Sequence, residues 1–281
     1  MKKAGVVGAG TMGNGIAQVA AEAGYEVTLF DIDEKGLTRG VNRIEKTLRN
    51  NVEKKKIDQA RAEEVKERIH PSVDIDDLYD ADIIFEAIIE KIEPKKELFT
   101  SLDKHCKPST IFASNTSGLS ITEMAGSVER SGKVIGMHFF NPVPVMKLVE
   151  IVKGEQTSEE TFNTAHQLVK EFGKTAITVE DAPLFAVNRV LAPMVNEAIF
   201  VLGEGTASAE DIDNGLKLGA SHPIGPLALA DLIGLDTMLF VIETLYTETN
   251  DSKYRPAPLL KKYVRAGKLG RKTGEGFFNY Q

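Results

Sequence analysis

KKAGVVGAGTMGNGIAQVAAEAGYEVTLFDID, residues 2–33, has the pattern of a strand, a glycine-rich turn, a helix and a second strand. The apolar run 4–7 is typical of a short buried strand, and Gly8, Gly10 and Gly13 after it fit G-x-G-x-x-G. Apolar side chains then recur at helical spacing. One glycine permits the tight turn, one lets a pyrophosphate approach the backbone, and one lets the helix pack on the strand. The stretch therefore predicts a dinucleotide site at a helix N-terminus.

The second predicted strand, 26–30, ends at Asp31, eighteen residues after Gly13. An acid at this place accepts hydrogen bonds from an adenosine ribose and repels a 2′-phosphate, so we expect NAD rather than NADP as the cofactor. Thr11 and Met12 lie inside the glycine turn and belong to the same predicted cofactor site.

Strands and helices alternate through the rest of the first half. The strand-like runs are 81–88, 110–116, 133–140, 147–152 and 176–181, and the helix-like runs are 37–48, 94–105 and 158–172. This alternation predicts the α/β class, with a doubly wound, mostly parallel Rossmann-type sheet. Ligands of such sheets bind at the carboxyl ends of the strands, where Asn115, Thr116, Ser117 and His138 fall.

From about Ala182 the pattern becomes all-helical. Apolar residues within 187–202 trace one helix face, Ser208 with Asp211 has the pattern of a capping box, and a later helical stretch is broken near Gly234. The chain therefore carries a second, all-α domain.

We expect an NAD-binding domain at 1–184 and a smaller helical domain for dimerisation and substrate binding at 185–281. Its apolar faces suit either self-association or packing on the first domain. A homodimer or a higher homo-oligomer is the expected assembly.

Composition excludes several classes of function. A net charge of −7 argues against a binder of nucleic acid or of membrane surfaces, which need a basic field. With 42% hydrophobic residues but no apolar run of about 18, and no signal peptide at the N-terminus, the chain is expected to be soluble and cytoplasmic. The single cysteine, Cys106, and histidines without ligand spacing predict no metal site.

The charged stretch 52–69 is expected to extend the preceding helix into a helical hairpin. The lysines at 54–56 within it are read as a solvated face. The alternative is that Lys54 and its neighbours meet a phosphorylated substrate tail, and Lys54 is kept as a candidate substrate-binding residue for that reason.

Several motifs together resemble a known family. They are GAGTMGNGIA, EAIIE, ASNTSGLSIT, HFFNPVPVMKLVEIV, NRVLAPMVNEA, HPIGPLALADLIGLD and LGRKTGEGFF. The chain resembles the short-chain L-3-hydroxyacyl-CoA dehydrogenases, most closely the bacterial 3-hydroxybutyryl-CoA dehydrogenases, over essentially its whole length. The resemblance implies NAD(H)-dependent interconversion of (3S)-3-hydroxyacyl-CoA, a CoA thioester, and 3-ketoacyl-CoA, by a dimer with a helical second domain.

The resemblance also assigns residues. It implies His138 as the catalytic general acid/base, Glu150 as its partner carboxylate, and Ser117 and Asn188 as catalytic and substrate-binding groups. The cofactor contacts that it implies beyond the glycine turn are Asp31, Glu90, Lys95 and Asn115.

Two positions depart from the family pattern. The family usually has glycine after the proline that precedes its N-R motif, but this chain has Leu184, and the run S-N-T-S-S is S-N-T-S-G here, with Gly118. Both departures are expected to affect the fit of substrate and cofactor, and Leu184 could reshape the domain hinge.

Two alternative functions share this framework. A related sugar-acid or β-hydroxyacid dehydrogenase would carry a catalytic lysine at the start of the helical domain, where Asn188 and Arg189 stand. A crystallin-like protein that binds without turnover would tolerate loss of His138 and Glu150, and both are present.

The chemistry of hydride transfer suits His138 and Glu150. An imidazole that titrates near neutrality can take the hydroxyl proton or return it, and a carboxylate can fix its tautomer and stabilise its charged form. Pro142 and Pro144 interrupt the strand after His138, so the next strand is free to run back along the sheet. We therefore expect Glu150, twelve positions later, to lie beside His138.

Overall fold

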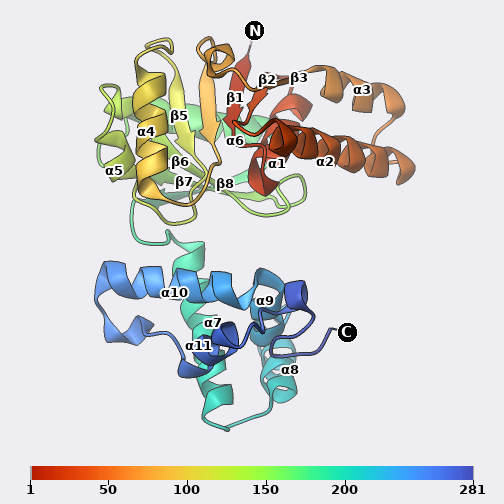
Figure 1. Cartoon of the computed structure of the whole chain (residues 1–281), viewed down its shortest axis with the longest axis vertical. Coiled ribbons are helices and arrows are strands. Elements are labelled where there is room, and N and C mark those ends of the chain that lie inside the picture. Colours follow the sequence, from red (N-terminus) through yellow and green to blue (C-terminus); the bar gives the residue numbers. More distant parts are fainter. Residues whose placement is uncertain (1, 281) are drawn as a thin grey trace. The chain divides into compact units, whose positions relative to one another are not determined.

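The computed structural model describes residues 2–280, which form two compact units. The first ends at Phe185 and the second begins at Ala186. The first contains a sheet with helices and the second contains helices (Figure 1).

One sheet organises the first unit. Its strands are β1 (Lys3–Val7), β2 (Glu26–Phe30), β3 (Ile69–Ser72), β4 (Ile83–Glu86), β5 (Ile111–Ser114), β6 (Val134–Phe139), β7 (Leu148–Lys153) and β8 (Thr175–Glu180). Within residues 2–280 they form an eight-stranded sheet in the order β3-β2-β1-β4-β5-β6-β7-β8. Neighbouring strands are parallel except β6 and β7, which are antiparallel. The strand order reverses next to β1, as in doubly wound dinucleotide-binding sheets, and the predicted fold class is confirmed.

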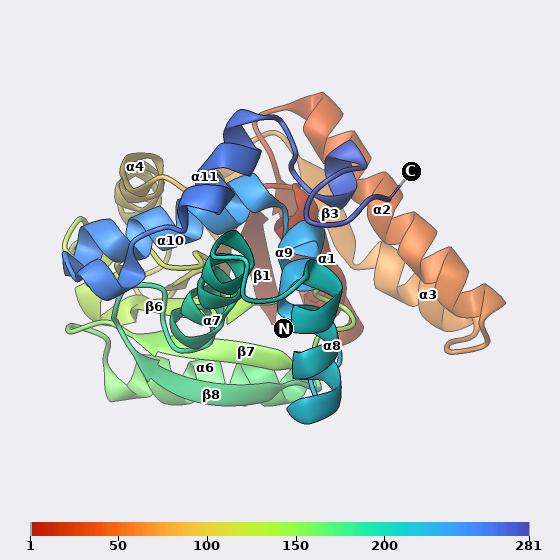
Figure 2. The ribbon, with the colours of Figure 1, turned by 90° about the horizontal axis from the view of Figure 1, so that it is seen from below.

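Helices cover both faces of this sheet. They are α1 (Thr11–Glu22), α2 (Glu34–Glu53), α3 (Gln59–Glu67), α4 (Ile92–Asp103), α5 (Ile121–Ala125) and α6 (Glu159–Glu171), with the 3₁₀ turns η1 (Ile75–Leu78) and η2 (Ser131–Lys133). Strand side chains alternate between two cores: Val6 packs with the helices α1, α2, α3 and α6, whereas Val7 packs with α4 and α5. Figure 2 shows α6 alongside β7 and β8.

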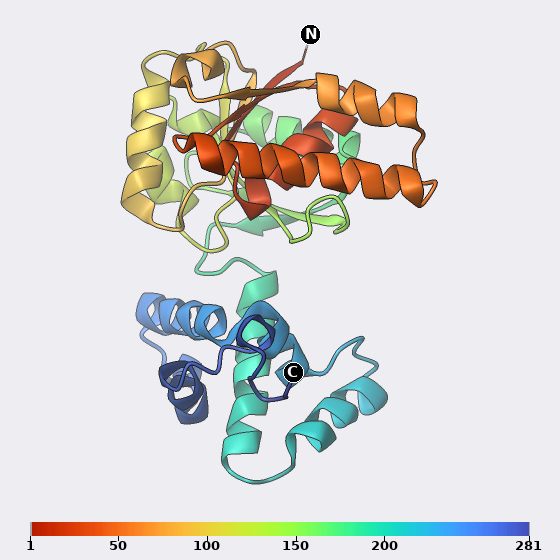
Figure 3. The same ribbon diagram turned by 45° about the vertical axis from the view of Figure 1, so that its right-hand side comes forward.

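The charged stretch after α2 forms the expected hairpin, since α2 and α3 lie side by side as the two orange helices of Figure 3. Asp58 caps α3 by accepting a hydrogen bond from the backbone N–H of Arg61 at 2.8 Å. The prediction was wrong at its end, because Ile69–Ser72 forms the edge strand β3. Pro71 is tolerated there because an edge strand has one unpaired side.

The second unit is all-helical, as predicted. Its elements are α7 (Val187–Gly203), α8 (Ala209–Gly219), α9 (Pro226–Ile233), α10 (Leu235–Thr249), α11 (Pro258–Arg265), η3 (Ser252–Tyr254) and η4 (Arg271–Thr273). The predicted cap is present, since the Ser208 hydroxyl accepts a hydrogen bond from the Asp211 N–H at 3.1 Å. The predicted break at Gly234 separates α9 from α10.

Asp231 fixes the C-terminal tail to α9. This carboxylate is buried and accepts hydrogen bonds from the backbone N–H groups of Phe277 and Phe278 at 3.0 and 2.9 Å. The hydroxyl of Tyr280 donates to it at 3.0 Å. Two distant motifs, LADLIG and GEGFF, therefore form one structural unit.

Candidate active site

The glycine turn between β1 and α1 fits a dinucleotide phosphate. A Cβ atom on Gly13 would overlap the carbonyl oxygen of Gly8, so only glycine lets α1 pack this closely. Among the described residues outside Gly10 and its immediate surroundings in the chain, no heavy atom lies within 4 Å of the place that a Cβ on Gly10 would take. The first turn of α1 carries no acidic residue, so no carboxylate of that turn offsets the partial positive charge of the helix N-terminus. This is the geometry that a pyrophosphate needs.

Asp31 lies beside this turn, as the sequence predicts. Its Oδ2 accepts a hydrogen bond from the Ala9 N–H at 2.8 Å, and its Oδ1 accepts one from the Asp33 N–H at 3.0 Å. Thr11 is exposed at the start of α1, whereas Met12 is partly buried against the core. The Asp31 carboxylate is therefore held at the edge of the site where a ribose hydroxyl is expected.

The structure brings His138 and Glu150 together. They are opposite each other in the antiparallel register of β6 and β7, and His138 Nδ1 lies 2.7 Å from Glu150 Oε2. His138 is 6% exposed and Glu150 is fully buried. Because the carboxylate faces Nδ1, the other ring nitrogen, Nε2, is the one suited to exchange a proton with a substrate.

Aromatic rings surround the imidazole. The ring centroid of Phe140 is 4.4 Å from that of His138, and the ring centroid of Phe185 is 5.8 Å away. Apolar walls exclude water and strengthen the electrostatic interaction between the imidazole and its carboxylate. A buried imidazole paired with a carboxylate is an arrangement that suits proton transfer.

Asn115 joins two strand ends next to the histidine. Its backbone N–H donates to the Glu86 carbonyl oxygen at 2.9 Å, and its side-chain oxygen accepts a hydrogen bond from the Phe139 N–H at 2.9 Å. Phe139 directly follows His138. Besides any contact with a cofactor, Asn115 therefore fixes the backbone that carries the imidazole.

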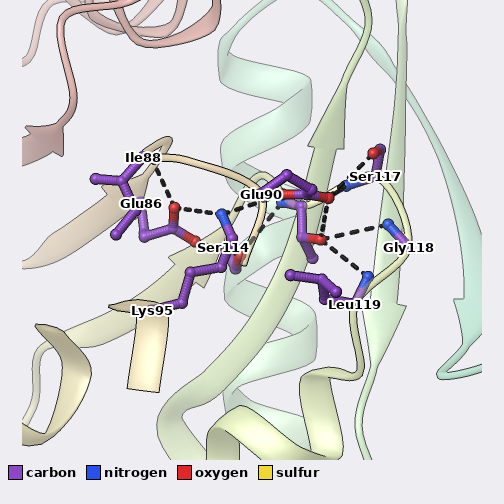
Figure 4. Close-up of polar contacts among 9 residues, drawn as sticks. Glu86, Ile88, Glu90, Lys95, Ser114, Ser117, Gly118 and Leu119 are labelled. Carbon is purple, nitrogen blue, oxygen red and sulfur yellow. Dashed lines mark hydrogen bonds and ion pairs between the residues drawn. The ribbon is translucent and has the colours of Figure 1, made fainter. Parts of the chain in front are cut away.

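Glu90 holds the predicted substrate serine (Figure 4). Its Oε1 accepts three hydrogen bonds: from the Thr116 hydroxyl at 2.6 Å, the Ser117 N–H at 2.8 Å and the Ser117 hydroxyl at 3.0 Å. Burial raises the pKa of Glu90, but the charge of Lys95 and these hydrogen bonds outweigh burial and leave the pKa below its ordinary value. Glu90 is therefore ionised near neutral pH.

Lys95 lies between two carboxylates. Its ammonium nitrogen is 2.6 Å from Glu86 Oε1 and 3.3 Å from Glu90 Oε2, and its side chain is 1% exposed. The Ser114 hydroxyl donates to the other Glu86 oxygen at 2.6 Å (Figure 4). The ammonium therefore faces Glu86 and Glu90 in this structure. The charged groups that lead from Glu86 to Ser117 are buried at Glu86 and Lys95 and partly exposed at Glu90.

Sequence reasoning missed Glu86. It is fully buried, and its carboxylate accepts hydrogen bonds from Lys95, Ser114 and the Ile88 N–H. The available signal was an acid at the carboxyl end of an apolar strand, in the run IIFE. Such an acid is costly to bury in its ionised form without a cation, and the lysine nine positions later supplies one.

The other two predicted substrate residues belong to helices. Lys54 is exposed at the C-terminal end of α2. Asn188 stands in the first turn of α7, in the second unit. Their contacts with substrate remain predictions.

Across residues 2–280, no group of three or more His, Cys, Asp or Glu side chains is arranged to hold a metal ion. In the same part of the chain, no helix has the length and apolar character to cross a membrane. Burial raises the pKa of the Cys106 thiol to about 11, so this thiol is protonated at neutral pH.

Comparison with known proteins covers the whole chain. The model of the 3-hydroxyacyl-CoA dehydrogenase NAD binding domain matches residues 3–182, and that of the C-terminal domain of the same enzymes matches residues 185–280. A probable 3-hydroxybutyryl-CoA dehydrogenase of Bacillus subtilis is 51% identical over 100% of this chain and 98% of its own length. A 3-hydroxybutyryl-CoA dehydrogenase of Clostridioides difficile is 48% identical over 99% of both chains. The crystal structure of (S)-3-hydroxybutyryl-CoA dehydrogenase from Ralstonia eutropha has a TM-score of 0.97 at 50% identity, covering 100% of this chain and 99% of that one.

Proposed function

Because this chain belongs to the 3-hydroxyacyl-CoA dehydrogenase family, we propose that it interconverts (3S)-3-hydroxybutyryl-CoA and acetoacetyl-CoA with NAD(H). The observation that carries the proposal is the buried His138–Glu150 pair at the carboxyl edge of the sheet that bears the glycine turn. The loop after β6 also packs on α1: a Cβ on Gly15 would lie 2.8 Å from Val143 Cβ.

In ketone reduction His138 donates a proton to the oxygen on C3 of the substrate, and in alcohol oxidation it takes that proton back. NAD(H), when bound, supplies or accepts the hydride. Glu150 accepts a hydrogen bond from Nδ1–H, which orients the ring and stabilises the positive charge that it carries after taking a proton. Proton and hydride together account for the two hydrogen atoms that the reaction moves.

Ser117 and Asn188 bind the reacting oxygen and the thioester end. In this structure the Ser117 hydroxyl donates to Glu90, so binding the reacting oxygen requires the hydroxyl hydrogen to turn from Glu90 to the substrate. Asn188, on α7, has an amide that can donate to a carbonyl oxygen.

The test is the rate of NADH consumption with acetoacetyl-CoA. Ser117→Ala should lower kcat about 10- to 100-fold, the scale of one hydrogen bond made in the transition state, and leave NADH binding unchanged. Ser101→Ala, on the exposed side of α4, is the matched control and should behave as wild type. Weaker NADH binding with unchanged kcat would assign Ser117 to the cofactor instead.

Comparing the turnover of CoA thioesters with that of free β-hydroxyacids separates the proposed function from its two alternatives. Turnover of free β-hydroxyacids without turnover of CoA thioesters would favour a β-hydroxyacid dehydrogenase. Binding of NADH without turnover of either substrate would favour a non-catalytic protein.

A homodimer in the cytoplasm belongs to the same proposal. Apolar side chains are exposed on the helices of the second unit: Val190 at 71%, Leu232 at 53% and Phe240 at 52%. Exposed apolar surface of this kind suits self-association. Sedimentation equilibrium should give twice the monomer mass, and a monomer at micromolar concentration would contradict it.

A further inference from the structure

The last two residues of the first unit form a strained corner. Leu184 has φ +61° and Phe185 has φ +56°, a region that residues with side chains seldom adopt. Both side chains are buried, at 3% exposure each. The Phe185 N–H donates to the Ala182 carbonyl oxygen at 3.0 Å, which closes the turn. Strain of this kind persists where packing determines the conformation, and often at functional sites.

Leu184 packs against Gly118, the residue after Ser117. A Cβ on Gly118 would overlap Leu184 Cδ2 and would lie 3.2 Å from Leu184 Cα and 3.3 Å from its backbone nitrogen. Any side chain at 118 must therefore displace Leu184 or move the turn that carries Ser117. Gly118 and Leu184, the two positions that depart from the family pattern, are thus in contact. The small residue at 118 leaves the space that the large side chain at 184 fills.

Phe185, the other residue of the corner, packs against the imidazole of His138. Its ring centroid is 5.8 Å from that of His138, with 56° between the ring planes. Two consecutive residues therefore contact the turn of Ser117 on one side and the imidazole on the other.

We propose that Leu184 is a positioning residue for Ser117. Its side chain closes the space over Gly118 and so holds the Ser117 turn against Glu90, while Phe185 holds the adjacent imidazole. The inference rests on the proposed function of Ser117 and His138. It requires positions 118 and 184 to be coupled in turnover, and not only in folding.

A double-mutant cycle on the full chain tests this coupling with NADH and acetoacetyl-CoA. Gly118→Ala should lower kcat about tenfold or more, because the new Cβ displaces Ser117. Leu184→Ala should lower kcat a few-fold, because the turn loses its support. The kcat of the double variant should be about fivefold or more above the value obtained by multiplying the two single effects, a coupling of the size found between residues in contact. It should stay below the wild-type kcat, because the new Cβ at 118 would still lie close to the backbone Cα and nitrogen of residue 184.

Two control variants keep catalysis apart from folding. A Cβ on Gly126 would meet only Glu123 O at 3.5 Å and Thr122 O at 3.6 Å, so Gly126→Ala should leave kcat unchanged. Leu48→Ala empties a core position in α2 and should weaken stability without changing kcat. Urea unfolding and the Kd of NADH are measured for every variant, and the Kd should not change.

The outcomes are distinct. A wild-type protein that does not oxidise NADH with acetoacetyl-CoA overturns the proposed function and the inference with it. Wild-type turnover with single effects that simply multiply, or with coupling seen only in urea unfolding, overturns the positioning role alone. If Gly118→Ala does not fold, Leu184→Ala alone decides: a kcat equal to that of Leu48→Ala overturns the role.

Discussion

Glu150 lies directly opposite His138 across the antiparallel strands β6 and β7, with 2.7 Å between its Oε2 and the imidazole Nδ1. Both strands lie inside the sheet, since β6 also pairs with β5 and β7 with β8. The pair is therefore held by backbone hydrogen bonds before any ligand binds. Such preorganisation is what proton transfer during hydride transfer requires.

His138→Gln should lower kcat with acetoacetyl-CoA by about 10² to 10⁴, the usual contribution of a general acid/base. The Kd of NADH, measured by fluorescence titration, should stay near the wild-type value. His166→Gln on α6, a half-buried histidine whose Nε2 lies 3.1 Å from the Thr178 hydroxyl, is the control and should keep full turnover. Near-normal turnover of His138→Gln would contradict its assignment.

Glu150→Gln should cost less kcat than His138→Gln. The amide keeps the shape of the carboxylate but not its charge, so the ring is still oriented while its protonated form is less stabilised. Steady-state kinetics of both variants at several pH values provide the comparison. A loss as large as that of His138→Gln would mean that Glu150 does more than orient and stabilise.

NADH should be strongly preferred to NADPH. A carboxylate about 4 Å from a 2′-phosphate at an effective dielectric of about 20 is repelled by about 4 kcal/mol per charge before solvent relaxes. Asp31→Ser should narrow the difference in kcat/KM between the two cofactors. Comparable kcat/KM values in the wild type would show that Asp31 does not face the ribose.

Lys95→Met should destabilise the first unit by about 3 to 5 kcal/mol, because Glu86 would be buried without its cation. Lys96→Met is the matched control: this lysine pairs with the more exposed Glu93 and Glu123 and should cost about 1 kcal/mol or less. Urea unfolding measures both. Equal effects would mean that water reaches the Glu86–Lys95 pair.

The depressed pKa of Glu90 predicts a loss of stability in acid. Because the pKa in the folded protein lies below the value of about 4.3 in an unfolded chain, ionised Glu90 favours folding. Its contribution is complete at neutral pH and disappears as the pH falls through about 4 and below. Glu90→Gln should flatten the pH dependence of the unfolding free energy in that range, while Glu93→Gln, whose side chain is 68% exposed, should not.

Local patterns predicted most of the fold. The glycine turn, the alternation of apolar runs, the cap at Ser208 and the helix break at Gly234 depend on neighbouring residues, and the structure contains them where expected. Edge strand β3 was missed because Ile69 continues a helical pattern and Pro71 is rare in strands. Its strand conformation comes from pairing with β2, which is not local in sequence.

The positions of candidate site residues were predictable where a polar or titratable residue lies in or just after a recognisable strand. His138, Glu150, Asp31 and Ser117 each follow or lie within a recognisable strand. The sequence signals a buried acid at Glu86, but neither its pairing with Lys95 nor the contact of Leu184 with Gly118 was predictable, because each joins two elements that no sequence period relates. Lys95 lies between two carboxylates, and its contact with the cofactor stays a prediction.

The antiparallel step between β6 and β7 makes the pairing of His138 with Glu150 sensitive to changes in chain length within β7 but not in the loop before it. Side chains alternate between the two faces of a strand, so deleting one residue between Leu148 and Glu150 would turn the carboxylate to the opposite face. Changes within the loop 141–147 leave the pairing of His138 with Glu150 unaltered, since the ladder sets it.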